Sequence, residues 1–313
     1  MLQLRRLVFA LAGSLALAAP ALAGKLAIVI DDFGYRPSTE NQVLAMPAEV
    51  SVAVLPNAPH AREMATKAHN QGHDVLIHLP MAPLSRQPLE KDTLRPDMNA
   101  DEISRIIREA VNSVPYAIGM NNHMGSAMTS SLPGMQKVMA SLAHYNLFFL
   151  DSMTIGNSQA MRAAAGTGVK VIKRKVFLDD TQNEADIRYQ FNRAVALARR
   201  NGSAIAIGHP HPSTVRVLQQ MLYSLPPDIT LVRASSLLNE PQVDTSRPDA
   251  TPPSQTAPAA PRNPFRGVKL CKPKRQPEPV YATRFFTVIS ESVSESPLVS
   301  YLRHQWQGWG KQS

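Results

Sequence analysis

Short apolar runs alternate along the chain with segments whose apolar residues recur every three or four positions. The first run, residues 26–30, is followed at once by Asp31 and Asp32. An unbroken apolar run of this length is typical of a strand buried on both faces, as in a parallel sheet. Two carboxylates at the end of such a strand are costly to bury unless they are paired, hydrogen-bonded or bound to a metal. Ordinary turn and helix-capping roles are the alternative for both residues.

Further apolar runs follow at regular intervals and predict more strands. They lie at residues 50–55, 74–79, 117–120, 147–150, 169–172, 203–207 and 229–232. Segments with helical spacing separate most of them, including a helix over 186–200 that Thr181 and Glu184 are expected to cap. Strands that alternate with helices predict βα units and a mostly parallel sheet. Seven or eight such units favour an α/β barrel or near-barrel over a small open sheet.

The amino-terminal residues 1–23 have the features of a secretory signal peptide. Two arginines precede an apolar stretch, and Ala21-Leu22-Ala23 has the small-x-small form of a cleavage site. The stretch is short for a membrane span, so an uncleaved anchor is the weaker alternative. We therefore expect export to the periplasm and a mature chain that begins at Gly24.

The remaining chain divides by composition into three parts. The alternating pattern fills residues 24–238, and proline and basic residues dominate residues 239–279, which predicts a linker. Residues 280–313 form an amphipathic segment that is a candidate for docking on an envelope partner or a membrane surface. This organisation predicts one large domain followed by a tail.

Composition adds two constraints to this picture. The 313 residues include a single cysteine, Cys271, so an intramolecular disulfide is excluded. The formal net charge is +9, but much of the excess lies in the signal and the tail. We therefore do not predict a nucleic-acid partner.

Polar residues that suit metal chemistry recur where the predicted strands end. They are Asp31, Asp32, His78, His123, Asp151 and His209. In a barrel these strand ends face the same mouth, so their side chains are expected to converge. Two imidazoles and one carboxylate form a known set of catalytic zinc ligands that leaves a position for water. A divalent metal, with zinc expected, would offset the cost of burying these groups together.

Two motifs give the chain a family resemblance. Residues 30–34, Ile-Asp-Asp-Phe-Gly, resemble the Asp-Asp motif of the polysaccharide deacetylase superfamily. Residues 72–78 resemble its Gly-His-Glu-Ile-x-x-His segment, and the whole run 25–238 resembles the divergent polysaccharide deacetylase family. The resemblance implies a metal-dependent N- or O-deacetylase on a distorted seven- or eight-stranded β/α barrel.

The resemblance also implies roles for individual residues. Asp31 would be the general base, while Asp32 and His78 would bind the metal. The superfamily usually has a second histidine four residues after the first, but this chain has Ala82 there. His123 is the candidate replacement.

The resemblance also implies that residues at two later strand ends supply the general acid of the superfamily reaction and the carboxylate that orients it. His209 lies where the late histidine acts as general acid, and Asp151 resembles the carboxylate that orients it. The usual Arg-x-Pro segment is not evident in this chain.

Three more residues are candidates for substrate binding. His211 lies two residues after His209 and competes with it for the acid role, although His209 is nearer the strand end. Asn121 and Asn122 precede His123 and are expected either to bind a sugar or to support His123. The asparagines have loop capping as an equal alternative.

Three functions remain open from the sequence. The first is a deacetylase that acts on an acetylated polysaccharide or on peptidoglycan. The second is a catalytically silent glycan-binding or envelope-assembly protein on the same fold, and the third is another metal hydrolase, because one ligand set serves several chemistries.

Overall fold

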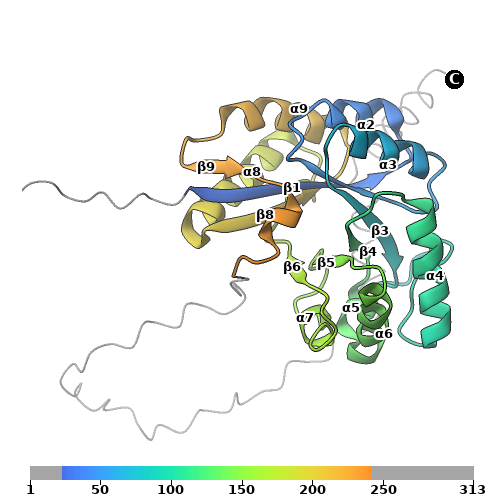
Figure 1. The fold of residues 1–313 in the computed structure, drawn as a ribbon. Coiled ribbons are helices and arrows are strands. Elements are labelled where there is room, and N and C mark those ends of the chain that lie inside the picture. Colours follow the sequence, from blue (N-terminus) through green and yellow to red (C-terminus); the bar gives the residue numbers. More distant parts are fainter. Residues whose placement is uncertain (1–22, 242–313) are drawn as a thin grey trace, which may run out of the picture. The chain divides into compact units, whose positions relative to one another are not determined.

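The strands of the computed structural model, which describes residues 23–241, form one curled parallel sheet (Figure 1). Along the sheet they run in the order β6 (Val171–Lys173), β5 (Phe148–Asp151), β4 (Gly119–Met124), β3 (Val75–Met81), β2 (Ser51–Val54), β1 (Gly24–Phe33), β8 (Ser203–Gly208) and β7 (Val176–Phe177). A further strand, β9 (Ile229–Leu231), pairs with the first residues of β1. The predicted signal peptide apart from Ala23, nearly all of the predicted linker and the carboxyl-terminal segment lie outside the described residues.

The connection between β6 and β7 shows why the sheet curls. These strands are consecutive in the chain but lie at opposite ends of the strand order, and only Arg174 and Lys175 separate them. Three Cα steps span at most about 11 Å, so the two edges of the sheet must lie close together. No ladder joins β6 to β7 within the described residues. The result is an incompletely closed barrel, which confirms the prediction of a distorted β/α barrel.

Helices surround the outside of this sheet (Figure 1). They are α2 (Pro37–Leu44), α3 (Ala61–Asn70), α4 (Ala100–Ser113), α5 (Ser126–Ser130), α6 (Leu132–Ala143), α7 (Ala160–Ala163), α8 (Glu184–Asn201) and α9 (Pro212–Met221), with 3₁₀ turns η1 (Leu222–Ser224) and η2 (Ala234–Leu237). Helix α4 shows why they pack there: Ile103, Ile106 and Ile107 form a buried stripe in the main core. Across residues 23–241, none of the helices combines the length and the apolar character that a bilayer crossing requires.

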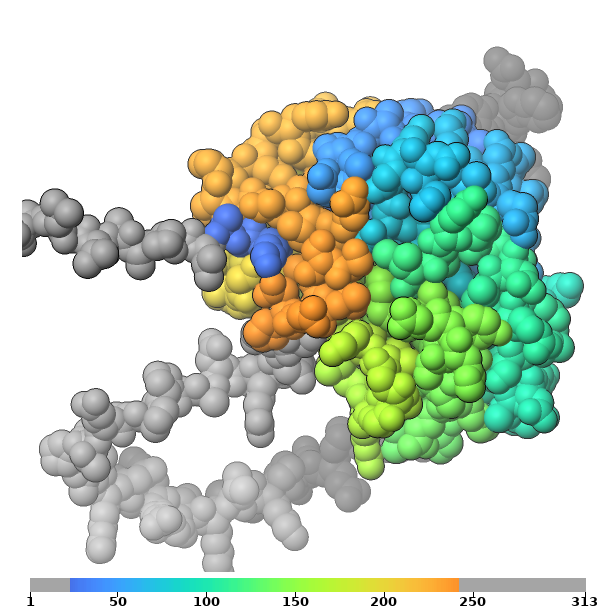
Figure 2. Space-filling model, in the orientation of Figure 1, coloured from blue at the N-terminus to red at the C-terminus, as the bar shows by residue number. Residues whose placement is uncertain are grey.

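A second apolar cluster fills the inside of the curl. Val29, Leu76, Leu150 and Ile207 contribute to it from the strands, and Leu237 of η2 joins them. The backbone N–H of Ala234 donates to Ser51 Oγ, which ties η2 to the start of β2. In the space-filling view the dark orange residues near the end of the described chain lie between the blue start of β1 and the green part of the domain (Figure 2). Apolar packing therefore closes the barrel at the amino-terminal ends of its strands. The polar residues lie at the carboxyl-terminal ends.

Several local predictions differ from the structure. The two-residue strand β7 was not predicted, and residues 158–168, whose sequence predicts a helix and a turn, contain only the four-residue helix α7. Glycines at 166 and 168 have a φ of 81°, which no helix allows. The cap of α8 is Asn183, whose Oδ1 accepts a hydrogen bond from the backbone N–H of Ala185 at 2.8 Å.

Candidate functional site

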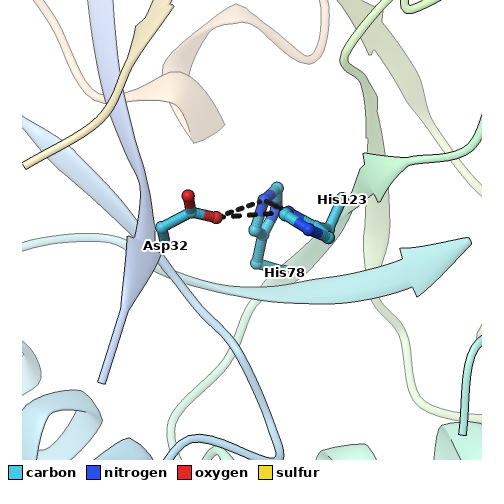
Figure 3. A group of neighbouring side chains, drawn as sticks. All are labelled: Asp32, His78 and His123. Atoms are coloured by element: carbon cyan, nitrogen blue, oxygen red, sulfur yellow. Dashed lines mark hydrogen bonds and ion pairs between the residues drawn. The ribbon is translucent and has the colours of Figure 1, made fainter. Parts of the chain in front are cut away.

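The three predicted metal ligands meet at the carboxyl ends of β1, β3 and β4. The Oδ1 atom of Asp32 lies 3.2 Å from His78 Nε2 and 3.2 Å from His123 Nδ1. The two imidazole nitrogens are 3.0 Å apart. Figure 3 shows the three side chains turned toward one another. One carboxylate oxygen and two ring nitrogens thus form a nearly equilateral triangle.

A bulge at the end of β1 brings Asp32 into this group. Ile30 pairs with Val52 and Phe33 pairs with Val54, so three steps along β1 match two along β2. Asp32 has a φ of 60°, a left-handed conformation that is rare for residues other than glycine. In a regular strand, adjacent side chains point to opposite faces. The extra residue lets Asp31 and Asp32 both approach His78, at 3.6 and 3.2 Å.

The triangle fits a divalent metal such as zinc. Tetrahedral ligands at Zn–N and Zn–O bonds of about 2.1 Å lie about 3.4 Å apart, close to the 3.0–3.2 Å found here. Asp32 Oδ1 is buried and receives no well-formed hydrogen bond. Such an atom is costly to bury unless a cation satisfies it. Burial alone would raise the pKa of Asp32, but the His123 and His78 rings hold it well below its usual range.

Asn121 links two of the functional side chains. Its Oδ1 accepts a hydrogen bond from His78 Nδ1 at 2.8 Å, and its Nδ2 donates to Asp31 Oδ1 at 2.8 Å. The first bond fixes the proton of His78 on Nδ1, so Nε2 offers its lone pair to the triangle. Asn121 is fully buried. The structure therefore places it inside the protein as a support rather than among substrate-binding groups.

Asp31 lies behind the triangle and is almost completely buried. Its side chain contacts Asn121 and approaches His78. Burial raises the pKa of the Asp31 carboxyl, and the nearby His78 and His209 rings act against that rise. A carboxylate whose pKa lies above its ordinary value binds a proton more readily near neutral pH.

His209 is held by a carboxylate that the sequence analysis missed. Asp179 Oδ1 accepts a hydrogen bond from His209 Nδ1 at 3.0 Å, and Asp179 Oδ2 accepts from the His209 backbone N–H and from Thr214 Oγ1. His209 Nε2 lies 3.9 Å from Asp32 Oδ2. Burial would lower the pKa of His209, but the hydrogen bond and charge of Asp179 raise it to about 9.

The predicted role of Asp151 beside His209 was wrong. Asp151 is fully buried at the end of β5, where its Oδ1 accepts a hydrogen bond from the backbone N–H of Met153. Its backbone carbonyl accepts from Arg174, a residue of the link between β6 and β7. Asp151 thus belongs to the support of this loop, and Asp179 takes the place assigned to it.

The other two substrate-binding candidates have different surroundings. Asn122 is buried, with its Oδ1 accepting from the Ser152 backbone and its Nδ2 donating to the Met124 carbonyl. His211 instead lines a cavity of about 200 Å³ together with Asp32, His123 and His209. Only His211 of the three candidates is therefore placed where a ligand can reach it.

The sequence pattern does not indicate one further residue of the cavity, Glu90. Glu90 lies in the irregular stretch after β3, and its Oε1 is 3.5 Å from His123 Nε2. No strand directly precedes Glu90, so a search for polar residues at the ends of predicted strands does not find it. It places a negative charge on the side of His123 that faces away from the triangle.

Comparisons with known proteins show which family this chain resembles. The model of a family described as divergent polysaccharide deacetylase matches residues 28–238. The chain is 77% identical over 312 residues to the uncharacterized protein YibQ of Escherichia coli (strain K12), which covers 100% of this chain and 97% of YibQ. It is 47% identical over 224 residues to an uncharacterized protein of Haemophilus influenzae, covering 72% and 80% of the two chains.

A solved structure supports the fold. The crystal structure of an uncharacterized protein from Agrobacterium tumefaciens C58 matches 70% of this chain and 91% of that chain, with a TM-score of 0.65 at 20% identity. The family match spans the strands that carry Asp31, Asp32, His78 and His123, and the residue His209 that follows β8. The chain belongs to the divergent polysaccharide deacetylase family.

Proposed function

We propose that this protein is an exported, metal-dependent deacetylase that hydrolyses N- or O-acetyl groups on an envelope polysaccharide or on a peptidoglycan sugar. The observation that carries the proposal is the triangle of Asp32, His78 and His123 beside a cavity. Family membership supplies the reaction class, and the two groups beside the triangle suit acid–base chemistry.

Asp32, His78 and His123 would hold the metal, for which we propose zinc. A metal bound there would lower the pKa of a water molecule and polarise the acetyl carbonyl. Asn121 keeps His78 in the tautomer that this binding requires. The Nε2 atom of His78 is thus in the protonation state that binds a metal before the metal is bound.

Asp31 is the proposed general base. It accepts one proton from the water whose oxygen forms the new bond to the acetyl carbon. Its burial favours the protonated form that results from this step, because the pKa of its carboxyl is raised.

His209 is the proposed general acid. Asp179 fixes Nδ1, which leaves Nε2 on the side of Asp32 and the cavity. With a pKa of about 9, His209 is protonated at neutral pH and can donate to the leaving amine or alkoxide. This proton completes the cleavage of the carbon–nitrogen or carbon–oxygen bond.

Metal analysis and acetate release test the proposal together. We expect about one zinc per chain in the purified protein and acetate release from acetylated glycans. Asp32→Ala and His78→Ala should lose the metal, whereas His209→Gln should retain it and lose turnover. Arg108→Gln on the outer helix α4 serves as a control that keeps both properties.

Two outcomes would contradict the proposal. Full metal content in Asp32→Ala and His78→Ala would remove the ligand assignment. Metal binding without acetate release from any acetylated sugar would favour the silent glycan-binding alternative.

Export is the part of the proposal that rests on the sequence alone. Its support is the pattern of residues 1–23, with Ala21-Leu22-Ala23 before Gly24. We expect the mature chain to be recovered in the periplasmic fraction with Gly24 at its amino terminus. Amino-terminal sequencing of the fractionated protein would show an intact Met1 if the segment were retained.

A further inference from the structure

Two residues that follow the bulge of β1 form one wall of the cavity. Tyr35 and Arg36 line it together with His209 and His211. The Tyr35 side chain is half exposed, so its ring is accessible to a ligand in the cavity. Neither residue belongs to the metal triangle or to the acid–base pair.

A buried carboxylate fixes the backbone of this wall. Glu40 of α2 is fully buried, and its Oε1 accepts hydrogen bonds from the backbone N–H groups of Tyr35 and Arg36, at 3.0 and 2.6 Å. Charge-assisted bonds of this kind are stronger than neutral ones. The wall is therefore held in place before a ligand binds, which reduces the entropy lost on binding.

Arg36 brings an unpaired charge to the cavity. Within residues 23–241 its guanidinium has neither a hydrogen bond nor a carboxylate at ion-pair distance. The acidic groups of the cavity lie next to other residues, because Asp32 contacts the two triangle histidines and Glu90 approaches His123. A guanidinium offers a planar fork of donors that matches the two oxygens of a carboxylate.

We propose that Arg36 selects acetylated glycans that carry a free carboxylate close to the acetyl group that is removed. This inference rests on the proposed function, because it assumes that sugars enter this cavity. The Tyr35 ring provides an apolar surface for the sugar ring, and Arg36 pairs with the acidic substituent. A glycan strand of peptidoglycan freed of its peptide stems has this chemistry.

A binding experiment with the full chain tests the inference separately from catalysis. The probes are a tetrasaccharide from a peptide-free peptidoglycan strand and the same tetrasaccharide with its carboxylates converted to carboxamides. The wild-type protein should bind the acidic form about three- to tenfold more tightly, as expected for one partly exposed charge-assisted pair. In Arg36→Gln this preference should fall to about one.

Controls and outcomes keep the two proposals distinguishable. Arg108→Gln removes an exposed charge of the same type on α4 and should retain the full preference, and thermal unfolding should show that both variants are folded. Equal binding of the two probes by the wild type, an undiminished preference in Arg36→Gln, or no binding of either probe would overturn the inference. Acetate release is measured in parallel, so a preference without turnover would remove the proposed reaction and leave the acidic glycan site.

Discussion

At the scale of single residues, the site depends on support from buried polar neighbours. Asn121 joins His78 to Asp31, and Asp179 joins His209 to Thr214. Each of these supports satisfies several polar atoms at once, as buried polar groups require. The functional side chains are therefore held in fixed orientations by residues that do not face the cavity.

Replacing Asp179 by Asn should impair the general acid His209 without affecting metal binding. The change keeps the shape of the side chain but removes the charge that raises the pKa of His209. A general acid contributes typically 10²- to 10⁴-fold to a rate, and we expect kcat to fall by about 10²-fold. The zinc content should stay at the wild-type level, and the measurements are steady-state acetate release and metal analysis. Asp180→Asn, an exposed neighbour, is the matched control; equal losses in both variants would contradict the role of Asp179.

The sequence revealed one carboxylate pair but not the other for a physical reason. Asp31 and Asp32 lie near the end of the ten-residue strand β1, directly after an apolar run of five residues that is long enough to recognise. Asp179 and Asp180 follow Val176-Phe177-Leu178, a run of only three apolar residues after a basic segment. The same pattern of apolar residues before two aspartates was present, but β7 is too short for periodicity to indicate a strand.

At the scale of elements, helix ends were harder to predict than helices. Helix α8 was expected from its apolar spacing, whereas its cap was assigned to Thr181 rather than Asn183. Both residues can cap a helix, and only the backbone path decides which side chain reaches the first turn. Asn183 has an extended conformation and bonds the N–H of Ala185, while the Thr181 hydroxyl donates to the Asp186 carboxylate.

A pair of alanine variants tests this difference. Asn183→Ala should lower the free energy of unfolding by about 1 kcal/mol, because it removes the cap of an 18-residue helix. Thr181→Ala removes only an exposed hydrogen bond and should change it by less than about 0.5 kcal/mol. Urea unfolding monitored by circular dichroism measures both. The reverse order would show that Thr181 is the working cap.

The other end of α8 carries a pH-dependent contact. Arg199 donates to both carboxylate oxygens of Asp228, at 2.5 and 2.9 Å, which ties the last turns of α8 to the loop before β9. This hydrogen bond lowers the pKa of Asp228 below the ordinary value of 3.8. A lowered carboxyl pKa stabilises the fold above the unfolded-state value and loses that effect as the pH falls further.

We therefore expect the stability gap between the wild type and Asp228→Asn to depend on pH. The wild type should have the higher melting temperature at pH 6, and the gap should close as the pH falls below about 3.8. Arg199→Gln should follow the same course, because it removes the same bond. A gap that is constant or widens on acidification, measured by thermal unfolding between pH 6 and pH 3, would refute this contribution.

At the scale of the described domain, stability and chemistry lie at opposite ends of the sheet. The strand–helix alternation predicted the barrel, because repeated βα units allow few arrangements. The alternation could not predict that β6 and β7, which only two residues separate in the sequence, lie at opposite ends of the strand order. That placement depends on pairings between distant segments. The amino end is closed by η2, whereas the carboxyl end carries the triangle and the cavity.

Replacing Leu237 by Ala tests this separation. Leu237 is 1% exposed inside the curl, so its loss should leave a cavity and lower the free energy of unfolding by about 2–5 kcal/mol. Zinc affinity, measured by competition with a chelating dye, should stay within about twofold of the wild type, because η2 contacts β2 and the turn before β3 at the amino end rather than the ligand residues. Leu84→Ala, at a side chain that is 67% exposed, should change neither quantity. A large loss of zinc affinity in Leu237→Ala under conditions where the protein stays folded would show that the two ends are coupled, and the metal ligands would then depend on the packing of the whole curl.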